Sequence, residues 1–227
     1  MFKYETHMHT YPVSKCANAS VIESLDFYKE MGYDGIFITN HFLDGHINVD
    51  PDLPYEEKLE FYFSDYEKAV EYGKEIGLKV FLGVELSYKG TDFLVYGLDK
   101  EWYLKNPQIM DMKKSTELQF MIDSGALVIQ AHPLREAGYI DHIRLFPRQV
   151  HGVEIFNACR TEFENEMAKL YAENYNLIKF AGSDNHCGRE QKLLSGVCFE
   201  RVIESEKDFV QCVKNGEMKI FTLKADG

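Results

Sequence analysis

The stretch Gly35-Ile36-Phe37-Ile38-Thr39-Asn40-His41 contains the pattern that decides the fold. An apolar run follows a glycine and ends in polar residues, as expected of a strand that is buried on both faces and then enters a loop. The same pattern returns in Ala126-Leu127-Val128-Ile129-Gln130-Ala131-His132. Strands of this kind are typical of parallel sheets with both faces covered, so the sequence predicts such a sheet.

Segments with helical signals alternate with the strands. Ser20 and Glu23 have the spacing of a capping box and predict a helix that stops near Gly32. A long amphipathic helix is expected from about Tyr55 to Ile76, and Gly77 ends it. Further helices are expected within residues 113–124, at 162–174 and at about 205–214. The alternation favours parallel strands that are joined by helical crossovers.

The number of expected strands favours a barrel. With seven or eight parallel strands, we predict an α/β fold in which residues 1–227 form a single domain, a closed or nearly closed barrel. An open doubly wound sheet is the second choice. The expected strands are Phe2–Thr6, Gly35–Thr39, Lys79–Leu86, Phe93–Gly97, Ala126–Ala131, Gly152–Phe156, Leu177–Ala181, Val197–Phe199 and Ile220–Leu223.

Composition excludes several classes of protein. Hydrophobic residues make up 45% of the chain, enough for a full core, and no apolar run is long enough for a membrane helix. The five cysteines are scattered and the start of the chain does not resemble a signal peptide, so we expect free thiols and a cytoplasmic location. A net charge of −12 without a basic run makes nucleic acid an unfavourable partner. The oligomeric state is not readable from the sequence.

Histidines and carboxylates follow the expected strands. In a parallel barrel the carboxyl ends of the strands share one rim, where active sites lie. Side chains from distant parts of the sequence are therefore expected to converge there: His7, His9, His41, Glu85, His132, Glu154, Asp184 and His186. The remaining histidines, His46, His142 and His151, have no such placement and are interpreted as structural or surface residues.

These residue types suit a metal cluster. Imidazole and carboxylate bind zinc, manganese and iron, and the pattern does not choose among them. Side chains two apart on a strand point to the same side, so His7 and His9 can hold one ion while Glu85 bridges two. The sequence contains no recognisable Ser-His-Asp triad, no cysteine in the sequence context of a nucleophile and no glycine-rich phosphate loop. Metal-activated water is therefore the expected nucleophile.

The motifs taken together resemble those of the PHP family, the polymerase and histidinol phosphatase domains, and especially its stand-alone bacterial phosphoesterases. They are His7-x-His9, Thr39-Asn40-His41, Gly83-Val84-Glu85, Ala131-His132-Pro133, Glu154-x-x-Asn157 and Ser183-Asp184-Asn185-His186. The resemblance implies a distorted (β/α)7 barrel with two or three divalent metal ions. It also implies hydrolysis of phosphate esters, histidinol phosphate among them, while other members accompany bacterial replicative polymerases.

The resemblance also implies a ligand set for each ion. The first ion is expected on His7, His9, Glu85 and Asp184. Glu85 would bridge to a second ion, held also by His132 and, as our candidate, Glu154. A third ion is expected on His41 and His186.

Two positions depart from the family pattern. Asn40 stands where the family usually has aspartate, and we expect its amide to support His41. The aspartate that often follows the first motif is missing, and Cys16 is the nearest replacement because a thiolate binds zinc or iron well.

The expected reaction is hydrolysis of a small phosphorylated metabolite, similar to histidinol phosphate or a nucleotide. A hydroxide held between two ions would attack phosphorus, and Asp184 or His186 would carry protons. Arginine suits a phosphate because its fork donates two hydrogen bonds. Three arginines each follow a motif residue by three positions and are the candidate phosphate ligands: Arg135, Arg160 and Arg189.

Three other functions remain open on this sequence. One is an exonuclease or other phosphodiesterase of the same family, which the acidic charge disfavours. Another is a metal-dependent amidohydrolase, which usually has a lysine at a strand end where none is clear here. The third is a non-catalytic metal-binding module, favoured only by the departures at Asn40 and near Cys16.

Overall fold

The computed structural model describes residues 1–225, so the last two residues of the predicted domain lie outside it. The strands of this part are β1 (Phe2–Glu5), β2 (Gly35–Ile38), β3 (Lys79–Tyr88), β4 (Thr91–Tyr96), β5 (Leu127–Ala131), β6 (Gly152–Asn157), β7 (Ile178–Gly182), β8 (Leu193–Phe199) and β9 (Lys219–Lys224). The helices are α1 (Val21–Glu30), α2 (Tyr55–Ile76), α3 (Lys100–Lys105), α4 (Lys114–Asp123), α5 (Glu162–Tyr175) and α6 (Glu206–Lys214), with short 3₁₀ helices η1 (Pro107–Asp111) and η2 (Gly188–Glu190).

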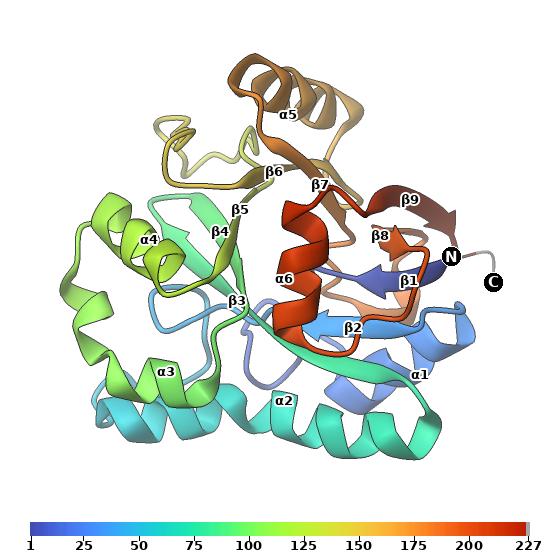
Figure 1. The fold of residues 1–227 in the computed structure, drawn as a ribbon. Coiled ribbons are helices and arrows are strands. Elements are labelled where there is room, and N and C mark those ends of the chain that lie inside the picture. Colours follow the sequence, from blue (N-terminus) through green and yellow to red (C-terminus); the bar gives the residue numbers. More distant parts are fainter. Residues whose placement is uncertain (226–227) are drawn as a thin grey trace.

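The described strands form one sheet that curls into a nearly closed barrel (Figure 1). Their order is β7-β6-β5-β4-β3-β2-β1-β8-β9. Just beyond β1 and β7, Met8 pairs with Asn185 in parallel, and the backbone N–H of His9 donates to the carbonyl of Asn185 at 2.9 Å. These contacts bring the two ends of the β1–β7 series together. The predicted distorted barrel is therefore confirmed.

The strand β3 joins two differently arranged parts of the sheet. Its first half pairs in parallel with β2, and its second half pairs with β4 in antiparallel fashion. The turn Lys89-Gly90 connects β3 to β4, and both residues have positive φ, 50° and 81°. Two residues are too few for a parallel crossover, which needs about a dozen. The expectation that β4 continues the parallel series is therefore wrong.

Other antiparallel pairings occur at β4–β5, β1–β8 and β8–β9. The parallel pairs are β1–β2, β2–β3, β5–β6 and β6–β7. The strand ends that carry the histidines still meet at one rim, because the strands β1, β2, β5, β6 and β7 run in the same direction around the barrel.

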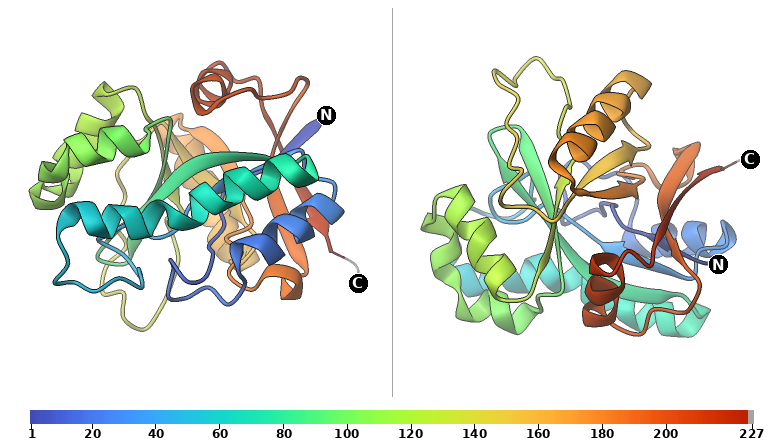
Figure 2. Two further views of the ribbon diagram at one scale, coloured as in Figure 1. Left: turned by 90° about the horizontal axis from the view of Figure 1, so that it is seen from below. Right: turned by 45° about the horizontal axis from the view of Figure 1, so that its top comes forward.

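The helices begin and end where local chemistry favours it. Ser20 and Glu23 form both bonds of the predicted capping box at the start of α1, and α2 ends at Gly77 with a left-handed φ of 67°. In Figure 2, α1 and α2 lie on one side of the sheet. Within residues 1–225 no helix is both long and apolar enough to cross a membrane.

The end of the barrel opposite the histidine rim is filled by aromatic side chains. Phe209 of α6 packs against Phe37, Tyr96 and Phe180, with ring centroids 4.3, 5.3 and 6.3 Å away. The backbone N–H of Ile203, on the segment before α6, donates to the hydroxyl of Tyr4. These contacts pack α6 and the segment before it against the end of the barrel.

Candidate metal centre

Five polar side chains meet at the rim and form what we call the inner group: His7, His9, Glu85, His132 and Asp184. His7 and Glu85 are completely buried, and His132 is the most exposed of the group at 6%. Nε2 of His7 lies 3.1 Å from Glu85 Oε1 and 3.3 Å from Asp184 Oδ1. Nε2 of His132 lies 3.4 Å from the same oxygen of Glu85. The structure thus brings these five side chains together at the rim.

The surroundings of Glu85 are the strongest indication that a cation binds at this site. Among the described residues neither of its oxygens has a hydrogen-bond partner, although both are buried. Nδ1 of His41 is 2.7 Å from Oε2, but the two atoms do not meet hydrogen-bond geometry. Burial would raise the pKa of Glu85, but the charges of His41, His7 and His9 hold it well below its ordinary value. A buried anion without donors, faced by imidazole nitrogens, fits a divalent metal ion.

A second set of side chains adjoins the first on its more open side, and we call Cys16, His41 and His186 the outer group. Their ligand atoms and one nitrogen of His9 all lie within 4.8 Å of one another. The side chains of His41 and His186 are 12% and 29% exposed. Burial raises the pKa of Cys16, but hydrogen bonds with His186 and His41 outweigh it and lower the pKa to about 6. Cys16 thus lies within reach of the histidines with which the sequence analysis associated it.

Hydrogen bonds fix which imidazole nitrogens face the centre. Nδ1 of His186 lies 2.8 Å from the carbonyl oxygen of Asp184. A carbonyl only accepts, so Nδ1 carries the proton and Nε2 keeps a lone pair for a metal. Nδ1 of His7 lies 3.0 Å from Glu154 in the same way, which leaves Nε2 of His7 free to face Glu85.

Glu154 does not take the place that the sequence analysis gave it. One oxygen accepts from His7, and the other accepts from Nδ2 of Asn157 at 2.9 Å and from the backbone N–H of His132 at 3.1 Å. Both oxygens are thus engaged behind the centre. The ligand role expected for Glu154 does not fit this geometry, whereas a role in orienting His7 and His132 does.

Asp92 is a further buried carboxylate at the rim, which the sequence analysis did not name. It is 2% exposed, and its Oδ2 lies 3.1 Å from Nη2 of Arg135, as an ion pair outside hydrogen-bond geometry, and 3.9 Å from Nε2 of His132. Burial raises the pKa of Asp92, and the neighbouring charge of Glu85 adds to the rise. Sequence reasoning missed it because β4 was expected to run parallel. An antiparallel β4 begins at the rim, and Asp92 is its second residue.

The backbone is constrained where the ligand-type residues lie. Asp184 and His132 both have positive φ, 54° and 24°, which is unusual for residues with side chains. Gly182 lies against His7, because a Cβ added to it would be 2.5 Å from Cβ of His7 and 2.7 Å from Oε1 of Glu154. The Gly182-Ser183-Asp184 segment can therefore approach the first histidine only if glycine precedes it.

Glu5 links the two segments that carry most of the inner group. Its Oε1 accepts from the backbone N–H of Thr6, His7 and Ser183, each at 2.9 Å, and its Oε2 accepts from the Ser183 hydroxyl. Burial raises the pKa of Glu5 to about 7. These bonds hold the end of β1 against the end of β7.

The three candidate arginines lie in different surroundings. Arg135 is 3.1 Å from Asp92. Arg160 follows β6, its backbone N–H donates to Asn157, and its Nε is buried without a partner in the described chain. Arg189 instead forms a two-armed ion pair with Glu30 of α1 and is about half exposed. Arg135 thus lies at Asp92, Arg160 has a buried nitrogen without a partner in the described chain, and Arg189 is engaged on the surface.

The three histidines interpreted as structural lie apart from the inner group. His46 and His142 are exposed. His151 accepts a hydrogen bond from the backbone of Val128, and burial together with Lys214 lowers its pKa to about 4.

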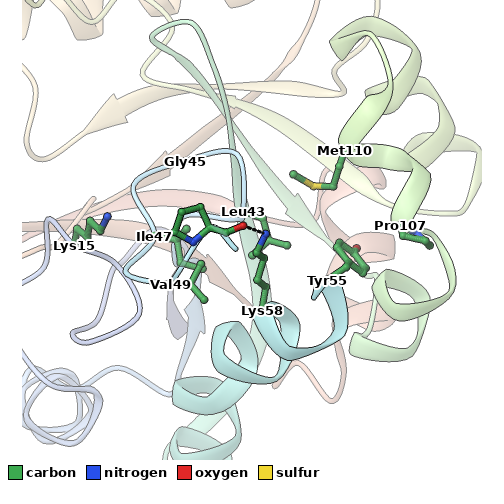
Figure 3. A pocket seen from close by; sticks show the side chains of 10 residues that line it. Lys15, Leu43, Gly45, Ile47, Val49, Tyr55, Lys58, Pro107 and Met110 are labelled. Carbon is green, nitrogen blue, oxygen red and sulfur yellow. Dashed lines mark hydrogen bonds between the residues drawn. The ribbon is translucent and has the colours of Figure 1, made fainter. Parts of the chain in front are cut away.

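A pocket of about 520 Å³ lies beside the outer group. Figure 3 shows its wall, which comes from Leu43, Ile47 and Val49 in the loop after His41 and from Tyr55 at the start of α2. Lys15, the neighbour of Cys16 in the sequence, reaches the same pocket. The wall is mostly apolar and contains no residue of the inner or outer group.

Comparison with known proteins identifies the fold. No protein-family model and no curated protein matches this chain. A two-domain protein from Bacteroides vulgatus that contains a predicted PHP-like metal-dependent phosphoesterase matches 97% of this chain at 14% identity and a TM-score of 0.70. This chain spans 64% of that protein.

Two further solved structures share the architecture. PsfC from Pseudomonas syringae matches with a TM-score of 0.61 and 14% identity, over 98% of this chain and 91% of its own. A protein from Bifidobacterium adolescentis, assigned as a metal-dependent phosphoesterase, matches with a TM-score of 0.53 and 14% identity, over 82% and 88%. The fold is that of PHP-like structures, which confirms the expected resemblance at the level of architecture.

Proposed function

We propose that this protein is a metal-dependent phosphoesterase that hydrolyses a small phosphomonoester. The observation that carries the proposal is Glu85, a buried carboxylate without hydrogen-bond donors among several imidazoles. Such an arrangement is costly without a cation, because a buried charge needs either a partner or a metal. The outer group beside it is partly open to solvent, which leaves room for a substrate.

The residues divide into three sets around three proposed ions. His7, His9, Glu85 and Asp184 would hold the first ion. Glu85 would also reach the second, together with His132 and Asp92. Cys16, His41 and His186 would hold the third, with His9 close by. Imidazole, carboxylate and thiolate together suit zinc or iron, and the inner group also suits manganese.

When bound, the ions would supply an activated water and stabilise charge on the phosphoryl oxygens. The chain supplies an acceptor for the released proton. Oδ1 of Asp184 lies within 3.4 Å of Nε2 of both His7 and His9, at the middle of the inner group. We assign Asp184 the removal of this proton, and His186 the positioning of Asp184 through the bond from its Nδ1 to the carbonyl oxygen of Asp184.

The phosphate would be held by arginine. Nε of Arg160 is buried without a partner among residues 1–225, which leaves its donors available for a phosphate oxygen. Arg135 lies at the Asp92 side of the centre and would contact the same group from there. The net charge of −12 disfavours a long nucleic acid, so a small metabolite or a nucleotide is the proposed substrate.

Metal analysis combined with three model substrates tests the proposal. The purified protein should contain two or three ions per chain and should hydrolyse p-nitrophenyl phosphate faster than bis(p-nitrophenyl) phosphate or an anilide. His9→Ala should lose both metal and hydrolysis, whereas the control His142→Ala should keep both, since His142 is an exposed histidine away from the centre. Preference for the diester or the anilide would favour the phosphodiesterase or amidohydrolase function. A protein that binds no metal after reconstitution would overturn the proposal.

A further inference from the structure

A chain of hydrogen bonds leads from the middle of α2 to the inner group. Asp65 of α2 is 1% exposed, and its Oδ2 accepts from the hydroxyl of Thr10 at 2.8 Å. That hydroxyl accepts from Nδ2 of Asn40 at 2.8 Å. Oδ1 of Asn40 accepts from the Ser14 hydroxyl at 2.8 Å, and the Ser14 oxygen lies 3.3 Å from Nδ1 of His9.

The direction of every bond in this chain is determined. The backbone N–H of Thr10 can only donate, and it lies 2.7 Å from Oδ1 of Asn40, so the amide nitrogen must face the Thr10 hydroxyl. Having accepted from Asn40, the Thr10 hydroxyl gives its single proton to Asp65. The residue types at positions 40 and 65 are therefore complementary, an amide at one and a carboxylate at the other.

The same reasoning assigns the proton on His9. Ser14 gives its only proton to Oδ1 of Asn40 and accepts from the backbone N–H of His41 at 3.1 Å. Toward His9 it can then only accept, so Nδ1 of His9 carries a proton. Nε2 keeps its lone pair and faces Glu85 and Asp184, both at 3.4 Å. The chain thus holds His9 in the tautomer that a metal requires.

We propose that Asn40 and Asp65 act as one unit that positions His9 and the segment between Thr10 and Cys16, with Asp65 as the positioning residue. Tyr62, one turn from Asp65 on α2, donates to the backbone carbonyl of Asn40 and fixes the same segment from the same helix. The metal-related part of this inference rests on the proposed metal centre. The pairing of the two residues depends only on the hydrogen bonds.

The unit explains why an asparagine stands at position 40. With a carboxylate there, two carboxylates would compete for the single proton of Thr10, and one buried carboxylate oxygen would be left facing the other without a proton between them. Exchanging the two residue types removes the conflict. In Asn40→Asp/Asp65→Asn, the amide at position 65 donates to Thr10, and Thr10 donates to the carboxylate at position 40. The number of hydrogen bonds and the net charge stay the same.

Four variants test this inference: Asn40→Asp, Asp65→Asn, their combination, and Asn174→Asp as a control for added charge on an exposed helix position. We expect Asn40→Asp to weaken zinc binding roughly 10-fold or more, because the carboxylates at positions 40 and 65 would repel each other and shift the segment that carries Ser14 and His9. The double variant should recover to within about 3-fold of the natural protein. Asp65→Asn should be mild, since an amide oxygen still accepts from Thr10, and Asn174→Asp should be neutral.

Two measurements separate a positioning role from general stability. The imidazole nitrogen resonances of His9 in the zinc-loaded protein should report a protonated Nδ1 in the natural protein and the double variant. Thermal unfolding of the metal-free variants should show the same rescue, because the hydrogen bonds do not need the metal. If the double variant lost as much stability and zinc affinity as the two single variants together, the proposed pairing of Asn40 with Asp65 would be wrong. If the natural protein binds none of zinc, iron and manganese, the proposed function fails, while the unfolding data still decide the Asn40–Asp65 unit.

Discussion

The inner and outer groups lie side by side but are built differently. The inner group comes from strand ends and is buried, and its members are held from behind: Glu154 bonds to His7, Asn157 bonds to Asp184, and Ser14 bonds to His9. The outer group combines His41, next to the end of β2, with Cys16 and His186 from loops, and the side chains of both histidines are partly exposed. In the outer group, the clearest hydrogen bond that orients a side chain is the one from His186 to the backbone carbonyl of Asp184.

This difference teaches which part of the centre is rigid and which part can adapt. Ligands with both nitrogens engaged have one orientation, so the inner group is set before any ion arrives. Loop ligands such as Cys16 and His41 can adjust to an ion or to a substrate. We therefore expect the inner ions to be bound tightly and to carry catalysis, and the outer ion to be weaker and to tune it.

Glu85→Gln is expected to have the largest effect, because it removes the one carboxylate that both inner ions share. We expect loss of both inner ions and a fall in kcat/KM for p-nitrophenyl phosphate of about 10³-fold or more. Inductively coupled plasma mass spectrometry and steady-state kinetics measure the two quantities.

Glu117→Gln is the matched control for this variant. Glu117 is also buried, but its partner is Lys114, at 2.7 Å and away from the centre. It should keep its metal content even if it unfolds more easily. If Glu85→Gln kept two tightly bound ions, the inner group would not be the rigid metal site that this comparison requires.

Cys16→Ser tests the outer group and should have an intermediate effect. A hydroxyl is a poorer ligand than a thiolate for zinc or cobalt, so the outer ion should bind about 10- to 100-fold more weakly while the inner ions remain. In the cobalt-substituted protein the thiolate-to-metal charge-transfer absorption should disappear. Cys187→Ser, at another half-buried cysteine near the rim, should leave this absorption intact. Equal absorption in both variants would show that Cys16 is not a ligand.

Much of the inner group could be predicted from sequence because strand ends are readable. A buried apolar run that ends in a polar residue locates His132 and the Asp184 segment of the inner group, as it does His41 of the outer group, and parallel strands bring those ends to one rim. Cys16 was harder, because a loop residue has no periodic signal. It was found only through the resemblance to the PHP family, as the nearest replacement for the missing aspartate.

The sequence analysis failed where the chain reverses direction. The parallel expectation placed the rim end of β4 at Gly97, whereas the hairpin at Lys89-Gly90 puts Asp92 there. The short Lys89-Gly90 connection was the available signal, since two-residue links join antiparallel strands. Glu154 was misassigned for another reason. Its place in the sequence does not reveal that His7 and the backbone of His132 already occupy its two oxygens.

Substitutions of the three arginines are expected to have the smallest effects on catalysis. They test from which side the phosphate of the substrate approaches the inner and outer groups. Arg135 is paired with Asp92 near the inner group, Arg160 has a buried nitrogen without a partner in the described chain, and Arg189 is paired with Glu30 on the surface. If the inner group carries catalysis, the phosphate must reach the inner side of the centre. Arg135→Ala and Arg160→Ala should then each raise KM about 10-fold, equivalent to about 1.4 kcal/mol, with metal content unchanged. Arg189→Ala is the matched control and should leave KM within about 2-fold, because an exposed ion pair contributes little. The reverse result, a large effect of Arg189→Ala alone, would mean that substrate approaches over the outer group and that the outer group, rather than the inner one, faces the phosphate.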